Sequence, residues 1–201
     1  MTVGPKAIVA ELLLNKTISV DNSNKKKLLN IQDNSIMGEP LLEECRQKIA
    51  NAKRRASITT WVSRFAGVKN LKHRIAGELV KKGILRADED KVLLVFSRKI
   101  YPELNPEPER KIIDRLHKAI FEDNEDFDAR TVVLLSLANS ADLLRLNFDK
   151  KKLKSRKKRI EKIVNGELAG KAAKEAIEAV QVAIMVAAIM PTIITTTVAT
   201  S

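Results

Sequence analysis

The sequence predicts a mainly α protein with a globular helical core, arranged as a bundle with surrounding amphipathic helices, and small β-hairpins near residues 17–31 and 84–96. Aromatic residues make up only 3% of the chain, and its apolar residues are chiefly Leu, Ile, Val and Ala. These residue types favour aliphatic packing between helices over a β-sandwich. Apolar residues recur at helical spacing along most of the chain, whereas two short β-prone segments lie beside turn-forming residues.

Length and composition indicate a single domain over residues 1–190, followed by a frayed tail over residues 191–201. A chain of 201 residues is long enough to bury a core without disulfides. Cys45 is the only cysteine, which excludes an internal disulfide. The N-terminus shows no charged leader followed by an apolar core, so we expect no secretory signal.

The C-terminal segment allows two interpretations. Residues 179–201 carry no charge, and a run of this length is sufficient to cross a bilayer. Pro191 interrupts the run, and its Thr- and Ala-rich composition differs from that of a typical membrane span. We therefore expect a packed helix with a frayed end, and a membrane-spanning tail is the alternative.

The spacing of apolar residues predicts helices along the whole chain. They are expected through residues 7–14, after Pro40, through Trp61 and Phe65 as far as Gly67, from Lys69 to Lys82, through residues 112–121, over the buried residues 131–146, and over the basic residues 150–162.

Two hairpins connect these helices. The first is predicted to pair residues 17–20 with residues 27–31. The second is predicted to pair Ile84 and Leu85 with residues 92–96 across a charged turn at residues 86–90. Gly83 would supply the left-handed cap that ends the preceding helix.

Catalysis is not expected. The chain has no His-Glu-x-x-His helix, no Gly-x-Ser-x-Gly elbow and no phosphate loop ending in Gly-Lys-Ser/Thr. His73 and His117 are its only histidines, and neither has a cysteine or carboxylate at metal-ligand spacing. We therefore expect no metal and no cofactor.

Charge indicates an anionic partner. The formal net charge is +12 and the pI is about 9.8, which suits nucleic acid, acidic lipid or an acidic protein. Lys69 and Lys72 are three residues apart, so on a helix they would lie about 5–6 Å apart on one face and could hold one phosphate. Such pairs are usually solvated surface. A basic helix directly before an apolar hairpin favours a membrane surface instead.

Several segments together resemble a known family. Residues 38–44 read Gly-Glu-Pro-Leu-Leu-Glu-Glu, residues 71–85 are expected to lead a helix into the second hairpin, Trp61 falls within an expected helix, and residues 128–144 are expected to form a buried helix. In this order and spacing they resemble the Golgi phosphoprotein 3 family, from about Ile8 to Val186. Residues 38–44 are similar to that family's Gly-Asp-Pro-Leu-Leu-Asp-Glu stretch.

The resemblance implies a helical core and a cytosolic adaptor that binds phosphatidylinositol 4-phosphate. In that family a Trp and an Arg near the N-terminus and two basic residues three apart hold the headgroup. The basic pair corresponds to Lys69 and Lys72, and Arg74 and Lys6 complete the candidate set. The family's headgroup Trp precedes the start of this chain and its Arg corresponds to Pro5, so we expect an N-terminally shortened member.

The leading hypothesis is a non-enzymatic peripheral membrane protein of the cytoplasm, at a Golgi-type membrane in a eukaryote. The expected partner is an anionic phosphoinositide, with a client membrane protein and self-association through the hairpin as further candidates. The hairpin would insert Leu93, Leu94 and Phe96. An auxiliary basic surface would consist of Lys151, Lys154, Lys157 and Lys158, on an amphipathic helix that packs Leu153 and Ile160.

Two alternatives remain. The helix–hairpin units at residues 7–31 and 71–96 would also suit a basic, winged-helix-like nucleic-acid-binding protein. The helix over residues 71–82 offers mainly Lys and Glu, however, whereas base readout favours Arg, Asn or Gln, so nucleic acid is the less favoured partner. A scaffold whose basic run binds an acidic protein is the third possibility.

Overall fold

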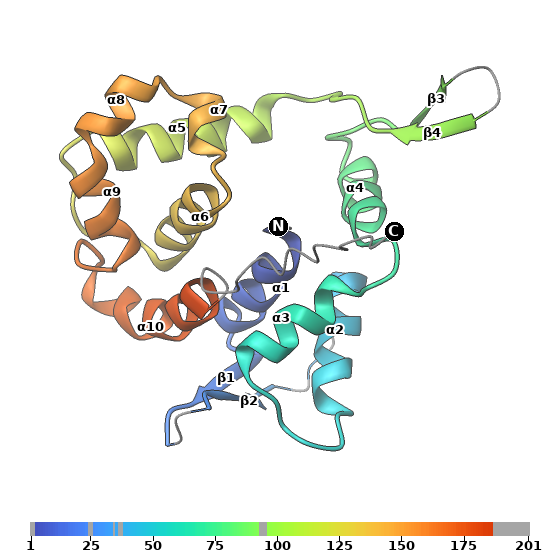
Figure 1. Cartoon of the computed structure of the whole chain (residues 1–201), viewed down its shortest axis with the longest axis horizontal. Helices are drawn as coiled ribbons and strands as arrows, with labels where there is room; N and C mark the ends of the chain where they lie inside the picture. The colour runs from blue at the N-terminus through green and yellow to red at the C-terminus, as the bar shows by residue number, and fades with distance from the viewer. Residues whose placement is uncertain (1–2, 24–25, 34, 36–37, 93–95, 187–201) are drawn as a thin grey trace, which may run out of the picture.

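A computed structural model describes residues 3–23, 26–33, 35, 38–92 and 96–186. The described residues form ten helices and two antiparallel hairpins, which confirms the predicted fold class (Figure 1). The helices are α1 (Val3–Leu14), α2 (Pro40–Ala50), α3 (Ile58–Ala66), α4 (Leu71–Lys81), α5 (Glu107–Phe121), α6 (Ala129–Ser140), α7 (Leu144–Asn147), α8 (Lys150–Ser155), α9 (Lys157–Val164) and α10 (Lys171–Val186). The strands are β1 (Ile18–Asp21), β2 (Leu28–Ile31), β3 (Asp88–Val92) and β4 (Phe96–Ile100).

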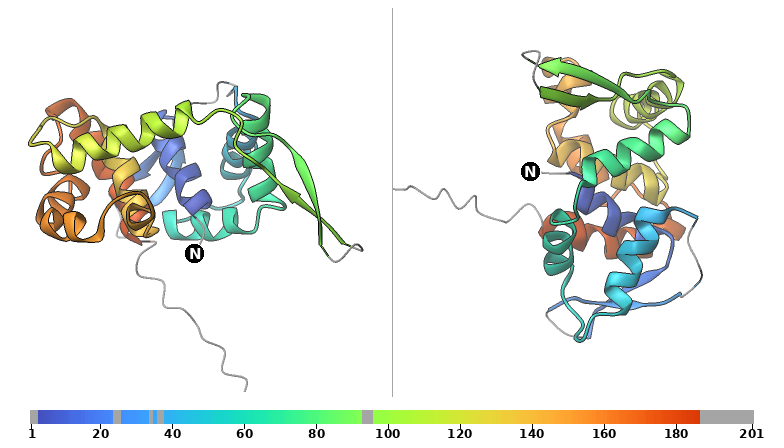
Figure 2. Two further views of the ribbon diagram at one scale, coloured as in Figure 1. Left: turned by 90° about the horizontal axis from the view of Figure 1, so that it is seen from above. Right: turned by 90° about the vertical axis from the view of Figure 1, so that its right-hand side faces the viewer.

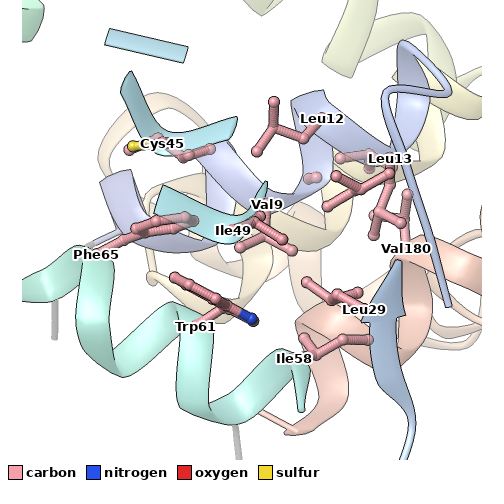
Figure 3. Packing of buried hydrophobic residues seen from close by; sticks show 14 of the residues in the cluster. Val9, Leu12, Leu13, Leu29, Cys45, Ile49, Ile58, Trp61, Phe65 and Val180 are labelled. Carbon is pink, nitrogen blue, oxygen red and sulfur yellow. The ribbon is translucent and has the colours of Figure 1, made fainter. Parts of the chain in front are cut away.

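Helix α1 lies at the centre of the first of two core clusters. It packs against α2, α3, α6 and α10, and so it is apolar on nearly all sides. Val9 and Leu12 are fully buried beside Phe65 of α3 and Val180 of α10 (Figure 3). A helix surrounded on several sides needs this continuous apolar surface rather than a single stripe.

The second cluster joins α5, α6 and α9. Its most buried members include Ile120, Leu135 and Ile163. Helices α6 and α10 contribute to both clusters, since Val133 and Val180 belong to the first and Val132 and Ile177 to the second. These two helices therefore connect the two halves of the molecule (Figures 1 and 2).

The first hairpin forms as predicted. Strand β1 pairs with β2 so that Ile18 lies opposite Ile31 and Asp21 opposite Leu28. The N–H of Leu29 also donates to the carbonyl of Ala56, which attaches the hairpin to the start of α3.

The second hairpin is shifted from its predicted position. Residues 88–90 belong to strand β3, so the charged segment 86–90 is not the turn. Val92 lies opposite Phe96, and residues 93–95 between them are outside the described residues. Pairing of the charged residues is favourable because Glu89 lies opposite Lys99. The apolar residues Ile84 and Leu85 instead meet the returning chain at residues 103–105.

The predicted helix over residues 131–146 is interrupted. Helix α6 ends at Ser140, and Asp142 adopts a positive φ of 60°. The N–H groups of Asp142 and Leu143 donate to the carbonyls of Asn139 and Ala138. This is a left-handed helix ending, a conformation that aspartate tolerates better than most residues other than glycine. The next helix, α7, begins at Leu144.

The basic run over residues 150–162 forms two helices rather than one. Helices α8 and α9 meet at Arg156, whose guanidinium bonds the carbonyl of Phe121 and the carboxylate of Asp123. Leu153 is half-buried and Ile160 is buried, as predicted.

Helix α10 runs through residues 171–186, and the predicted frayed tail over residues 191–201 lies outside the described residues. Within the described part of the chain, no helix has both the length and the apolar character needed to cross a membrane.

Candidate functional site

The start of α4 is an uncapped helix end. Gly67 ends α3, Asn70 turns the chain with a φ of 55°, and α4 begins at Leu71. No side chain caps the helix, and the N–H groups of Lys72 and His73 make no hydrogen bond to the described residues. Free N–H groups and the positive end of the helix dipole together favour an anion at this position.

Lys69 and Lys72 flank this helix end. Lys72 lies in the first turn of α4, but Lys69 lies in the preceding turn and not on the helix, contrary to the prediction. Both side chains are exposed and make no hydrogen bond or ion pair with the described residues. Two free ammonium groups beside unpaired N–H donors can surround a phosphate from more than one direction.

Arg74, the third residue predicted for the headgroup site, forms an ion pair within the protein. Its guanidinium lies 2.7 Å from the carboxylate of Glu44 on α2. The hydrogen bond from Arg74 holds the pKa of the Glu44 carboxyl below its usual value. Arg74 therefore joins α4 to α2, and its charge is partly neutralised within the protein.

Lys6 belongs to the first turns of α1 and is only 5% exposed. Burial lowers the pKa of its amine, which has no hydrogen bond or ion pair with the described residues. A Cβ added to Gly4 would lie 3.4 Å from Ile75 and 3.5 Å from Leu71. The start of α1 at Gly4 therefore lies against the first turns of α4.

The second hairpin extends directly from the other end of α4. Gly83 has a φ of 68°, and the N–H of Ile84 donates to the carbonyl of Leu79, as predicted for a left-handed helix cap. His73 of α4 and Tyr101 after β4 share a hydrogen bond of 2.9 Å. These contacts fix the base of the hairpin, which projects from the body of the molecule (Figure 2).

The predicted membrane-inserting residues fall only partly within the described residues. Leu93 and Leu94 are outside the described residues, and Phe96 is the first residue of β4. A hollow of about 430 Å³ lies between α4 and the hairpin. Asp88 and Glu89 line it against the single cation of Lys99, so this hollow is less suited to an anion than the start of α4.

The auxiliary basic surface is exposed as predicted. Lys151, Lys154 and Lys158 make no hydrogen bond or ion pair with the described residues, and Lys157 lies 3.7 Å from Glu161. The arginines of the run do not face outward with the lysines. Arg159 donates to the backbone carbonyls of Ala119 and Asn124, and so it holds α9 on the connection after α5.

Comparison with protein families decides the relationship of the chain. The family model described as Golgi phosphoprotein 3 (GPP34) matches residues 7–180. The chain belongs to the Golgi phosphoprotein 3 family. The match includes α4, its hairpin and the basic helices α8 and α9. It confirms the resemblance found in the sequence, and the family is one of Golgi-associated, non-enzymatic adaptors.

Within the described residues of this Golgi phosphoprotein 3 family member, no group of His, Cys, Asp or Glu side chains is arranged to hold a metal ion. The structure adds the N–H groups of Lys72 and His73 to the candidate site. In the sequence, only Asn70 points to this open helix start, because asparagine tolerates the left-handed conformation directly before a helix.

Proposed function

We propose that this chain is a non-enzymatic peripheral membrane protein that binds a phosphoinositide headgroup, of the phosphatidylinositol 4-phosphate type, at the start of α4. Lys69 and Lys72 contact the phosphate, the free N–H groups of the first turn of α4 hydrogen-bond to it, and Lys6 adds a charge from α1. The apolar hairpin residues Leu93, Leu94 and Phe96 enter the membrane as a second point of attachment.

The uncapped start of α4 is the observation that carries this proposal. Unpaired backbone donors, the positive helix end and two lysines without an ion pair among the described residues lie together at this helix start. No Ser, Thr, Asp or Asn side chain bonds the first N–H groups of α4, so these groups stay open to a ligand. A bound phosphate would satisfy them.

Family membership supports the same proposal, since the family consists of Golgi-associated adaptors. The proposal therefore includes a cytoplasmic location at a Golgi-type membrane in a eukaryotic host, an adaptor role toward a client membrane protein, and self-association through the β3–β4 hairpin. Lysine lacks the planar fork with which arginine binds phosphate, so the headgroup affinity should fall below that of an arginine pair.

Vesicle flotation tests the proposal. Vesicles of phosphatidylcholine alone, with phosphatidylserine, and with phosphatidylinositol 4-phosphate are compared for the wild type and for the double variant Lys69→Ala with Lys72→Ala. We expect the double variant to lose phosphoinositide binding about tenfold or more while its binding to phosphatidylserine changes less. The control, Lys53→Ala with Arg54→Ala, removes the same charge from an exposed segment after α2.

Equal flotation of the wild type with all three vesicles would contradict a headgroup site, as would wild-type affinity in the Lys69 and Lys72 double variant. Helix α1 is buried by the core, so it cannot act as a recognition helix in a major groove.

Duplex DNA serves as a competitor that tests the nucleic-acid alternative. Displacement of the protein from vesicles by DNA at physiological salt would favour the nucleic-acid alternative.

A further inference from the structure

The break between α6 and α7 exposes two leucines. Leu143 is 41% exposed and Leu146 is 78% exposed, whereas Leu144 between them is only 4% exposed. Leu146 is the most exposed of the large apolar side chains in the described part of the chain. The helix ending at Asp142 turns Leu144 into the core, and the single turn of α7 leaves its two leucine neighbours on the outside.

These leucines border an apolar hollow of about 580 Å³. Ile112 and Ile113 of α5 and Leu79 of α4 form other parts of its wall, and Ile112 is itself 46% exposed. Glu103 and Glu109 also line the hollow, and contiguous exposed apolar side chains with a polar border are typical of interaction surfaces.

A basic hollow adjoins the apolar one on the other side of α7. It measures about 430 Å³, and Arg145, Lys150 and Lys154 line it. Leu144 lines both hollows, so the two are neighbours in space. Lys150 and Lys154 are four residues apart on α8, and neither forms an ion pair with the described residues.

The charges in this second hollow are not balanced. Arg145 is paired with Asp142 at 3.1 Å and Lys157 with Glu161 at 3.7 Å, which leaves the two lysines of α8 as uncompensated cations. Protruding leucines next to free lysines match the two layers of an anionic membrane surface, in which the apolar boundary lies just below the phosphates. A groove for a protein helix would instead be expected to bury its leucines within the hollow.

We infer that Leu143 and Leu146 of the α7 region insert into the membrane interface while Lys150 and Lys154 of α8 contact lipid phosphates. This second membrane contact rests on the proposed peripheral membrane function. Helix α8 and the β3–β4 hairpin lie at opposite ends of the long axis of the molecule (Figure 1). Attachment at both ends would fix the orientation of the protein on the membrane, which a single headgroup site could not do.

Site-specific labelling of the full chain tests this inference. Cys45 is fully buried, and burial raises its pKa to about 11, so a new surface cysteine should react selectively. Leu146→Cys carries a polarity-sensitive dye, and Gln47→Cys on the exposed face of α2 is the matched control. On phosphatidylcholine vesicles containing phosphatidylserine, the fluorescence emission of the dye at position 146 is expected to shift to the blue, and lipids with spin labels near the headgroup should quench it. The emission of the dye at position 47 should show neither the shift nor the quenching.

Flotation of Leu143→Ser with Leu146→Ser gives the second measurement. We expect its partition coefficient on the same vesicles to fall about tenfold. Leu104→Ser, at an exposed leucine before α5, should match the wild type.

The outcomes separate this inference from the function on which it rests. If the wild type floats but the dye at position 146 stays in water, the second contact is wrong and the site at α4 stands. If the wild type does not float at all, the proposed function fails. A blue shift that appears without vesicles and grows with protein concentration would overturn the inference, because it would mean that a second copy of the chain covers these leucines.

Discussion

The guanidinium of Arg74 on α4 lies 2.7 Å from the carboxylate of Glu44 on α2. A second ion pair, between Lys82 and Glu39 at 2.6 Å, joins the end of α4 to the residue before α2. The segment from Glu39 to Glu44 thus contacts α4 near both of its ends. This arrangement fixes the direction of α4, and with it the uncapped helix start and the hairpin base.

Loss of the Glu44 charge should weaken this attachment in a pH-dependent way. The hydrogen bond from Arg74 lowers the pKa of Glu44 in the folded state. The Glu44 charge therefore contributes to the free energy of unfolding above the unfolded-state pKa near 4.5, and this contribution is lost as the pH falls through the folded-state pKa. Both side chains are partly exposed, so Glu44→Gln should lower the free energy of unfolding by at most about 1 kcal/mol at neutral pH.

Urea denaturation across pH measures this difference. Glu78→Gln is the control, because Glu78 pairs with Lys81 within α4 and joins no two helices. A Glu44→Gln effect that persists unchanged at a pH well below 4.5 would show that the ion pair is not its source.

Replacement of Lys6 should stabilise the protein and weaken its function. Lys6 is only 5% exposed and its amine has no partner among the described residues, and this burial disfavours the charged form of the amine. Lys6→Met should therefore raise the free energy of unfolding by about 1 kcal/mol, while Lys53→Met at an exposed position changes it little. If Lys6 serves the headgroup, the same variant should bind phosphoinositide vesicles less tightly.

The pH dependence has a defined sign. Because the folded pKa of Lys6 lies below the ordinary value of 10.5, the cost of the buried charge is complete at neutral pH and disappears as the pH rises toward 10.5. The difference in free energy of unfolding between Lys6→Met and the wild type should therefore shrink in that range. A difference of the same size at both ends of the range would show that packing, not charge, is responsible.

Local signals in the sequence predicted much of the fold. Pro40 opens α2, Gly83 ends α4 in the left-handed conformation, and the turn-forming residues Asn22 and Ser23 follow β1 in the first hairpin. Each of these depends on the conformational preference of one or two residues, so no knowledge of the tertiary structure was needed.

The errors arose where tertiary contacts or a less common residue decided the outcome. Asp142 ends α6 although aspartate takes the left-handed conformation less often than glycine, and Arg156 divides the basic run because it bonds the carbonyl of Phe121. Similarly, the partner of Arg74 lies 30 positions earlier in the chain, on a different helix. Spacing along one helix could not show any of these contacts.

Arg159 should matter more for stability than the lysines beside it. Its guanidinium donates to the carbonyls of Ala119 and Asn124 and lies 5.7 Å from the ring of Phe127. Arg159→Ala leaves these carbonyls without their donor and should cost about 2 kcal/mol of unfolding free energy. Lys158→Ala, at an exposed neighbour, should cost under about 0.5 kcal/mol. Equal melting temperatures for the two variants would contradict the structural role of Arg159.

The auxiliary basic surface should attract anionic membranes without selecting a headgroup. Lys151, Lys154, Lys157 and Lys158 are exposed, and the described residues form no enclosed site around all four. Each lysine near an anionic surface contributes about 1 kcal/mol, and this attraction is screened by salt. Replacing all four by Ala should therefore weaken binding to phosphatidylserine vesicles and to phosphoinositide vesicles by similar factors, with a smaller effect at high ionic strength.

The matched variant for this experiment is Lys69→Ala with Lys72→Ala, which should weaken phosphoinositide binding more than phosphatidylserine binding. The contrast follows from geometry, because Lys69 and Lys72 lie together at the start of one helix, whereas the four lysines of the auxiliary surface are spread over α8 and α9. Flotation at two salt concentrations, together with DNA binding by fluorescence anisotropy, measures both effects. A quadruple variant that keeps its full affinity for vesicles but loses DNA binding would assign the auxiliary surface to nucleic acid.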